Sequence, residues 1–503
     1  MHTCADPLRR AILTSRHSLA VVCGKSRLTY EESWVRCRRL AGGLRDLGLS
    51  PGDRVALIAA NCHRYLEVYQ AVPAAGLVVV PLNTRHTERE LEYALADSGA
   101  RVLLTDRDPA RLAAIVERVI RLPDEYEALL EDAREADLGA GIGEEDLAGL
   151  FYTGGTTGAS KGVMLTHRNL IANTFHGLVQ MPMTARDRYL VMAPLFHAAG
   201  SMSVLGSVWI GATQVVLPAF DPAQALSLIE AEGITATLGV PTMVAALADE
   251  QLARPRDVSS LALLAHGGSP IATETLLRAH AAFPGAELQH LYGATETAPL
   301  ATGLAHEEDL LDTPRVRSCG VPVVGVEIRV VNDAGHDVPR GEVGEVIIRG
   351  PNIMKGYWNK PEETAAALRN GWYHSGDLGY LDDGTSLYLV DRKKDMIVTG
   401  GENVYSTEVE DALYSHAAIM EAAVFGIPHP RWGEAVHAVV VLREPVDVDA
   451  LLAHCRDRIA GYKTPKTIEV RSEPLPKSGA GKILKRELRD VFWAGQKSRV
   501  AGG

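Results

Sequence analysis

Aromatic residues are scarce in this sequence and make up only 6% of its 503 residues, so an apolar core must depend mainly on Ala, Val and Leu. The apolar fraction of 46% and the charged fraction of 23% are ordinary for a soluble globular protein. They exclude disorder as the dominant state, because the chain has ample apolar material for a core. The length predicts more than one domain.

The sequence also lacks paired cysteines, since its six cysteines are scattered without a Cys-x-x-Cys spacing. This pattern predicts free thiols in a reducing compartment and argues against a disulfide framework or a thiolate zinc site. Basic residues at Arg9, Arg10 and Arg16 interrupt the apolar runs before Gly24, which argues against a secretory signal. We therefore expect a cytoplasmic protein.

An excess of positive charge is absent as well, because the net charge is −12, and this argues against nucleic acid as the main partner. The charge is unevenly distributed. From Lys393 onward there are 16 Lys and Arg against 15 Asp and Glu, a net charge of +1, which leaves −13 for the rest of the chain. The less acidic C-terminal fifth suits a polyanionic small molecule.

One segment, Tyr189 to Phe220, has no Asp, Glu, Lys or Arg over 32 residues. Its two prolines and three glycines make a lipid-spanning helix a poor interpretation. We expect a buried strand, loop and helix around a pocket instead, and no transmembrane segment.

Strand-like and helix-like patterns alternate through the first part of the chain. Residues 54–60 and 77–80 read as strands around a helix at 63–75, and Asp221-Pro222 is typical of a helix start. This alternation predicts parallel sheets covered by helices, and hence the α/β class. After about Arg315, short β-branched runs between turns predict a smaller antiparallel β region.

A charged run at Asp391-Arg-Lys-Lys-Asp395 lies where the composition changes, which favours a domain linker. An α+β module follows it. We therefore predict two domains, residues 1–393 and residues 394–503.

The segment from Tyr152 to Lys161 contains three glycines, three threonines and one lysine. Glycine lets backbone amides approach an anion, threonine adds hydroxyl donors and lysine adds charge, so the loop is a candidate triphosphate site. It differs from a Walker A loop, since Lys161 follows Ser160 and precedes Gly162. A strand-like run before the loop and a helix-like stretch after it support the interpretation.

Several further motifs follow in order. They are Pro194-Leu-Phe-His197, Gly267-Gly-Ser-Pro270, Tyr292-Gly-Ala-Thr-Glu-Thr297, Ser375-Gly-Asp377, Gly400-Gly-Glu-Asn403 and Pro476-Lys-Ser-Gly-Ala-Gly-Lys482. With the first loop, they resemble the adenylate-forming enzymes, which include acyl-CoA synthetases, aryl-CoA ligases, luciferases and peptide-synthetase adenylation domains. The resemblance runs from about Leu28 to Leu488 and is greatest to bacterial fatty-acid or aryl-acid CoA ligases. It implies a large N-terminal domain of stacked α/β subdomains with a β region, and a small mobile C-terminal α+β domain.

The same resemblance implies a site for ATP and AMP. Its residues would be Thr153, Gly154, Gly155, Thr156, Thr157, Lys161, Gly268, Ser269, Pro270, Tyr292, Gly293, Asp377 and Arg392. Tyr292 would stack on adenine, and Asp377 and Arg392 would hold the ribose. Gly154 and Ser160 depart from the family pattern, where Ser and Pro are usual.

Catalytic roles are also carried over from the family. Thr295 would bind the α-phosphate, Glu296 would hold Mg²⁺, and Lys482 would stabilise charge on the α-phosphate. His197 would line the carboxylate and acyl site, whose other predicted residues are Ala199, Ser203, Gly268 and Gly293.

For the second half of the reaction, the resemblance implies a hinge at Lys394. It also implies coenzyme A contacts at Arg85, Gly401 and Trp432. The expected reaction joins a carboxylic acid to the thiol of CoA in two steps, through an acyl-adenylate, with release of pyrophosphate and AMP. The co-substrates and cofactor would be ATP, CoA and Mg²⁺.

Two alternatives stay open at this point: an adenylation enzyme that loads a carrier protein, and a non-catalytic nucleotide-binding protein. Leu291 and the uncharged segment around His197 offer no basic residue for a second carboxylate, so an apolar monocarboxylate, fatty or aryl, is expected. The oligomeric state is left open.

Overall fold

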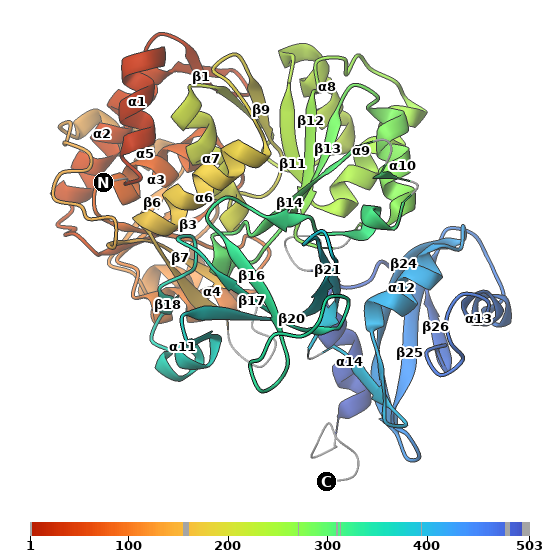
Figure 1. The fold of residues 1–503 in the computed structure, drawn as a ribbon. Coiled ribbons are helices and arrows are strands. Elements are labelled where there is room, and N and C mark those ends of the chain that lie inside the picture. The colour runs from red at the N-terminus through yellow and green to blue at the C-terminus, as the bar shows by residue number, and fades with distance from the viewer. Residues whose placement is uncertain are drawn as a thin grey trace. The chain divides into compact units, whose positions relative to one another are not determined.

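The computed structural model describes residues 3–153, 160–269, 271–307, 310–311, 313–393, 395–477 and 483–494. The chain forms two compact units (Figure 1). The first comprises Met1–Pro270, Thr275–Ile328 and Ile348–Tyr373, and the second comprises Ile271–Glu274, Arg329–Ile347 and His374–Gly503.

The first unit contains a long mixed sheet. Its strands lie in the order β15 (Val321–Pro322), β14 (Thr302–His306), β13 (Glu287–Tyr292), β12 (Leu263–Gly267), β11 (Ala236–Gly239), β9 (Arg188–Val191), β10 (Thr213–Val216), β1 (Leu19–Cys23) and β2 (Ser26–Thr29). The pairs from β13 through to β1 are parallel, and the outer pairs are antiparallel. Such a parallel centre is the arrangement that alternating strands and helices predict.

A second sheet in this unit has the order β18 (Gly356–Tyr357), β8 (Lys161–Thr166), β7 (Leu147–Thr153), β4 (Val78–Pro81), β3 (Arg54–Ile58), β5 (Val102–Thr105) and β6 (Arg118–Arg121). Here β7, β8 and β18 pair antiparallel, and the other pairs are parallel. Apolar side chains of β3, β4 and β5 form a buried core with helix α4.

Helices cover these sheets, and α3 packs against β1 of the first sheet and against β4 and β7 of the second. The helix bounds are α1 Asp6–Ser15, α2 Tyr30–Asp46, α3 His63–Ala74, α4 Glu88–Ser98, α5 Asp124–Asp132, α6 His167–Gln180, α7 Ala198–Ile210, α8 Pro222–Glu232, α9 Pro241–Ala253, α10 Thr273–Ala282 and α11 Pro361–Ala367. Helix α9 packs against β11 and β12, and α8 packs against α9 and β9 (Figure 1). Short 3₁₀ helices occur at Ala110–Ala114, Thr295–Thr297 and Pro314–Arg317.

The helix start predicted at Asp221 is confirmed. The Asp221 carboxylate accepts a hydrogen bond of 2.8 Å from the Gln224 amide, and Pro222 is the first helical residue. The helix ends at Gly233, whose φ of +61° is the left-handed conformation that glycine adopts at low cost.

A third sheet carries the short β runs that the sequence predicts after Arg315. Its order is β16 (Glu327–Val331), β17 (Gly344–Arg349), β20 (Trp372–Leu381) and β19 (Leu368–Arg369), with β21 (Leu387–Arg392) also paired to β20. The predicted linker differs at its start, because Asp391 and Arg392 complete β21 and Asp391 is buried. Ladder hydrogen bonds to β20 hold these two residues in the sheet.

The second unit ends in the predicted α+β module. Its sheet has the order β23 (Glu402–Val404), β22 (Ile397–Thr399), β25 (Gly433–Leu442) and β24 (Ile419–His429), with β26 (Thr467–Arg471) parallel to β25. Helices α12 (Ser406–Tyr414), α13 (Val448–Arg456) and α14 (Lys485–Trp493) accompany it. Aliphatic side chains of β24, β25, α12 and α13 form its buried core.

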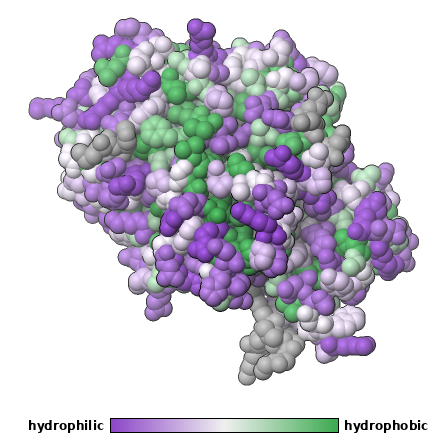
Figure 2. Space-filling model, in the orientation of Figure 1, coloured by the Kyte–Doolittle hydropathy of each residue, from purple (hydrophilic) through white to green (hydrophobic). Residues whose placement is uncertain are grey.

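Most of the surface visible in Figure 2 is hydrophilic. Within the described parts of the chain, no helix is both long and apolar enough to cross a membrane. The uncharged segment forms β9, α7 and β10, and α7 is largely buried. The expectation of a buried strand, loop and helix is confirmed.

Candidate functional site

The predicted motifs that begin at Gly267 and at Tyr292 meet at one edge of the first sheet. Strands β12 and β13 are parallel neighbours, and Gly267 pairs with Leu291. Their carboxyl ends therefore lie side by side, which places Gly268 and Ser269 next to Tyr292 and Gly293. Gly268 has a φ of +84°, a conformation that favours glycine.

The turn after Tyr292 is tightly packed. A Cβ atom on Gly293 would lie 1.8 Å from the Pro299 carbonyl oxygen, so no larger residue fits this backbone. The Thr297 hydroxyl accepts a hydrogen bond of 2.9 Å from the Ala294 amide. This turn presents Thr295 and Glu296, which are both partly exposed.

Two buried asparagines hold the far side of this turn. The Asn352 amide donates to the carbonyl oxygens of Thr297 and Leu300 at 2.7 and 2.8 Å, and the Asn173 amide donates to the same two oxygens at 3.2 and 3.3 Å. Both asparagines are fully buried. A buried carbonyl needs such partners, so these amides stabilise the turn that carries Glu296.

Glu296 is also linked to the first predicted loop through a tyrosine. The Tyr357 hydroxyl donates to Glu296 Oε1 at 2.8 Å, and Lys161 Nζ lies 4.9 Å from the centroid of the Tyr357 ring. A cation at this distance from an aromatic face is attracted by the ring. The structure therefore brings the predicted metal ligand Glu296 to the hydroxyl of Tyr357 and the predicted phosphate ligand Lys161 to its ring.

The first loop itself joins two paired strands, because Thr153 at the end of β7 pairs with Lys161 at the start of β8. Gly154, Gly155, Thr156 and Thr157 lie outside the described residues. So do Pro270, the predicted hinge residue Lys394 and the catalytic candidate Lys482.

The segment that carries His197 is fixed by polar contacts from two other elements. The Asn61 side-chain oxygen accepts from the Leu195 amide at 2.9 Å, and the Tyr69 hydroxyl donates to the Leu195 carbonyl at 2.6 Å. His197 precedes α7, and its ring lies 4.5 Å from that of Phe196. Half-buried His197 thus follows a backbone segment that these two hydrogen bonds hold in place.

Further along α7, Ala199 is half-buried and Ser203 is buried. The Ser203 hydroxyl donates to the Ala199 carbonyl at 3.1 Å and lies 2.9 Å from the Tyr189 hydroxyl. Burial raises the pKa of Tyr189 to about 12, so its hydroxyl stays protonated at neutral pH. The Ser203 hydroxyl is therefore already hydrogen-bonded within the protein. What Ser203 offers the predicted acyl site is its small side chain.

In the second unit, the two predicted ribose residues form an ion pair. Asp377 on β20 pairs in register with Arg392 on β21, and Arg392 Nε lies 2.5 Å from Asp377 Oδ1. The Asp377 amide donates to the Ser375 hydroxyl at 3.0 Å. Buried Asp377 is thereby oriented as a fixed acceptor, which is the chemistry that a diol requires.

The predicted coenzyme A residues Gly401 and Trp432 lie close together. Gly400 and Gly401, with φ of +61° and +89°, form the two-residue turn between β22 and β23, a conformation that favours glycine. The Gly400 amide donates to the Trp432 carbonyl at 2.8 Å. The Trp432 ring stacks on His429 at 4.1 Å, with Lys466 Nζ 5.4 Å from its centroid. Arg85, in the first unit, is exposed.

A partly buried charge network, missed by the sequence interpretation, lies at the start of α14. Lys485 Nζ is 2.7 Å from Glu410 Oε1 and donates to the Ser406 hydroxyl at 2.7 Å. The Ser406 hydroxyl in turn donates to Asp391 at 3.0 Å. Burial raises the pKa of Asp391 and of Glu410. The network anchors the helix that follows Lys482 to the base of α12.

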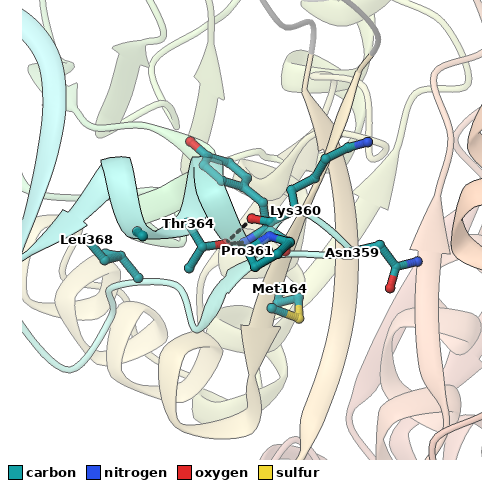
Figure 3. Close-up of a pocket in the computed structure, with 8 residues that line it drawn as sticks. Met164, Asn359, Lys360, Pro361, Thr364 and Leu368 are labelled. Carbon is teal, nitrogen blue, oxygen red and sulfur yellow. Dashed lines mark hydrogen bonds between the residues drawn. The ribbon is translucent and has the colours of Figure 1, made fainter.

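A surface cavity of about 460 Å³ lies where α11 and β18 meet β8 (Figure 3). Its lining residues are Met164, Tyr357, Asn359, Lys360, Pro361, Thr364, Ala365 and Leu368. The predicted acyl-site residues are not among them. Tyr357 is the member that also contacts the candidate site.

Tyr357, Asn352 and Asn173 were missed by sequence reasoning. They lie outside the motifs, and the pattern of Lys355-Gly-Tyr-Trp-Asn359 does not show which strand it will pair with. The nearest signal in the sequence is Gly356, because a glycine can mark a special backbone position. The structure shows such a position there, with a φ of +145°.

Comparison with known proteins identifies the family. Residues 8–358 match the AMP-binding enzyme family, and residues 408–482 match the AMP-binding enzyme C-terminal domain. Because these models span most of the chain, it belongs to the AMP-binding enzyme family. The resemblance inferred from the motifs, the α/β fold and the small C-terminal domain are confirmed.

Among individual relatives, a feruloyl-CoA synthase of Amycolatopsis is 44% identical over 97% of this chain and 98% of its own length. A long-chain-fatty-acid–CoA ligase of Bacillus subtilis is 35% identical over 92% of this chain and 90% of its own. The o-succinylbenzoate CoA synthetase of B. subtilis, solved with an acyl-adenylate intermediate, superposes with a TM-score of 0.88 at 32% identity, covering 97% and 98% of the two chains. Its complex with ATP and magnesium ion gives a TM-score of 0.86 at 31% identity, covering 96% and 99%.

Proposed function

We propose that this protein is an AMP-forming carboxylate–CoA ligase. It uses ATP to convert a carboxylic acid into an acyl-adenylate and then transfers the acyl group to the thiol of coenzyme A. The observation that carries the proposal is the family membership over most of the chain, combined with the Lys161, Tyr357 and Glu296 cluster beside the strand ends at Gly268 and Tyr292.

In the first step, a carboxylate oxygen of the substrate bonds to the α-phosphorus, and the bond to the leaving pyrophosphate breaks. We assign the triphosphate to Thr153, Gly154, Gly155, Thr156, Thr157 and Lys161, and the α-phosphate to Thr295 and Lys482. Donors and cations at these positions would stabilise the charge that develops on the phosphoryl oxygens. Tyr292, Gly268, Ser269, Pro270 and Gly293 would hold the adenine, and Asp377 and Arg392 the ribose.

The chemistry of Glu296 fits a magnesium ion that arrives with the nucleotide. Among the residues that the structure describes, no group of three or more His, Cys, Asp or Glu side chains is arranged to hold a metal. Mg²⁺ is typically held by one or two carboxylates with waters and substrate phosphates, so a single glutamate on a fixed turn is a suitable partner. When bound, the ion supplies positive charge to the phosphate oxygens.

In the second step, the sulfur of the CoA thiol bonds to the acyl carbon, the bond from that carbon to the phosphate oxygen of AMP breaks, and the thiol proton passes to the solvent as AMP leaves. We assign coenzyme A contacts to Arg85, Gly401 and Trp432. The Gly400-Gly401 turn carries no side chain of its own, lies beside Trp432 and has open space at Gly401, which suits passage of a pantetheine arm. We propose that residues 394–503 move about Lys394 between the two steps.

For the acid, we propose an aromatic monocarboxylate of the hydroxycinnamate type over a fatty acid. The support is the higher identity to feruloyl-CoA synthase, 44%, than to the fatty-acid ligase, 35%. A second support is half-buried Ala199, two residues after His197, whose small side chain suits a flat acyl group.

The test is a panel of acids with ATP, Mg²⁺ and CoA, with AMP formation and the mass of the thioester as readouts. Ferulate and related cinnamates are expected to give the highest kcat/KM, hexadecanoate a lower value, and malonate none. A higher kcat/KM for hexadecanoate would overturn the aromatic assignment while keeping the ligase.

An assay in which free CoA is the only thiol distinguishes the ligase from the carrier-loading enzyme and from the non-catalytic protein. Thioester formed with CoA alone excludes a strict carrier-protein enzyme. Pyrophosphate release without a CoA thioester would instead support carrier loading, and no release with any acid would support a non-catalytic nucleotide-binding protein.

A further inference from the structure

We propose that Tyr357 is a positioning residue that sets the Glu296 carboxylate and the Lys161 ammonium for Mg²⁺ and ATP together. The proposal rests on the roles of Glu296 and Lys161 in the proposed function. Its basis is that one side chain contacts both groups, through its hydroxyl on one and its ring on the other.

The hydroxyl contact orients the carboxylate. Tyr357 Oη donates to Glu296 Oε1 at 2.8 Å, and the tyrosine is only 9% exposed, so the hydrogen bond is shielded from water. A donor on one carboxylate oxygen restricts rotation of the group and leaves the other oxygen as a metal ligand. Partners of this kind tune metal affinity without touching the metal.

The ring contact restrains the lysine. Lys161 Nζ lies 4.9 Å from the ring centroid, which holds the ammonium near the start of β8. A long lysine side chain loses rotamer freedom when it binds phosphate, so a prior contact lowers that entropic cost.

The backbone fixes Tyr357 between the two elements it serves. Strand β18 pairs with β8, with Tyr357 opposite Val163, and the Trp358 amide donates to the Gly162 carbonyl at 2.8 Å. On the other side, the Met354 amide donates to the Glu296 carbonyl at 2.9 Å. The segment 354–358 therefore joins the strand after the phosphate loop to the turn that carries Glu296.

The two contacts can be separated by substitution. Tyr357→Phe keeps the ring and removes the hydroxyl, whereas Tyr357→Leu removes both. ATP binding is measured by calorimetry without acid or CoA, so that no turnover occurs, once across a Mg²⁺ titration and once in EDTA.

For Tyr357→Phe we expect about a tenfold increase in the Mg²⁺ concentration that gives half-maximal ATP binding, as is typical when a partner of a metal ligand is lost. Its ATP affinity in EDTA should equal that of the unchanged protein. Tyr357→Leu should show the same Mg²⁺ shift together with weaker ATP binding in EDTA, because Lys161 is no longer restrained.

The matched control is Tyr126→Phe, which removes a hydroxyl that donates to a carboxylate, Glu67 Oε2, at 2.7 Å elsewhere in the same unit. It should leave the Mg²⁺ dependence unchanged, even if it lowers thermal stability. An equal Mg²⁺ shift in Tyr126→Phe would show a general structural effect and overturn the proposal.

Glu296→Gln separates failure of this proposal from failure of the proposed function. If Glu296→Gln shifts the Mg²⁺ dependence and Tyr357→Phe does not, the positioning role of Tyr357 is overturned and the metal role of Glu296 stands. If neither variant shifts it, the metal role of Glu296 is overturned, and the proposal for Tyr357 with it.

Discussion

At the scale of single residues, several candidate residues have little freedom within their own unit. Gly293 admits no Cβ atom, Asp377 is held by Arg392, and Glu296 is held by Tyr357. Such fixed groups suit catalysis, because they stabilise a transition state without reorganising at the moment of reaction.

Lys482 is the residue whose predicted role is most specific to one step. We expect Lys482→Ala to abolish adenylation, because the variant lacks the cation at the α-phosphate, and to spare thioester formation from a supplied acyl-adenylate. Pyrophosphate release and thioester mass, assayed separately, measure the two half-reactions. Equal loss in both would refute the assignment.

At the scale of elements, three neighbouring strands place a histidine cluster in the interior. His266 on β12, His290 on β13 and His306 on β14 are buried, and their ring centroids lie 4.8 to 6.0 Å apart. Burial lowers the pKa of His290 to about 4 and that of His306 to about 3, and it places the pKa of His266 well below its usual value. The folded protein therefore keeps these rings neutral.

This cluster predicts loss of stability in mild acid. An unfolded histidine takes up a proton near pH 6.5, but these folded ones do not until the pH is much lower, so the free energy of unfolding should fall as the pH drops below that value. Each such group contributes a slope of about 1.4 kcal/mol per pH unit. Chemical denaturation between pH 7 and 5 measures the effect.

His306→Leu should reduce that slope, since it removes one titrating group. His336→Gln is the control, because it replaces an exposed histidine that lies outside the cluster. A His306→Leu slope equal to that of the unchanged protein would contradict the prediction.

The elements themselves were well predicted by pattern. The strand–helix–strand unit at residues 54–80 and the helix between Asp221 and Gly233 appear as β3, α3, β4 and α8. Local signals suffice there, because caps, glycine and apolar periodicity act within a few residues. The linker was predicted less well. In the sequence Asp391 and Arg392 resemble a solvated turn, but in the structure they pair with β20 and belong to a strand.

At the scale of the whole molecule, the division into two domains at Lys394 stays a prediction. It has a consequence for how the C-terminal domain moves. The Gly401 turn and Lys482 serve different steps in the proposed function, so residues 394–503 must present different faces in each. A change in backbone dihedrals at the hinge would allow that.

Lys394→Pro tests this movement, because proline restricts φ and should trap one pose. We expect one half-reaction to survive and the other to be lost. Lys394→Ala is the control and should keep both, since it leaves the backbone free. Unchanged overall turnover in Lys394→Pro would contradict a hinge at this position.

The sequence by itself determined the family, the α/β class and most of the candidate residues, because catalytic motifs are short and contiguous and their order along the chain is specific. Tertiary structure alone decided which distant groups meet. Tyr357 reaches Glu296 and Lys161 only because β18 pairs with β8, and His266, His290 and His306 form one cluster only because β12, β13 and β14 are neighbours. Strand pairing is set by long-range packing and register, which no local pattern of residues specifies.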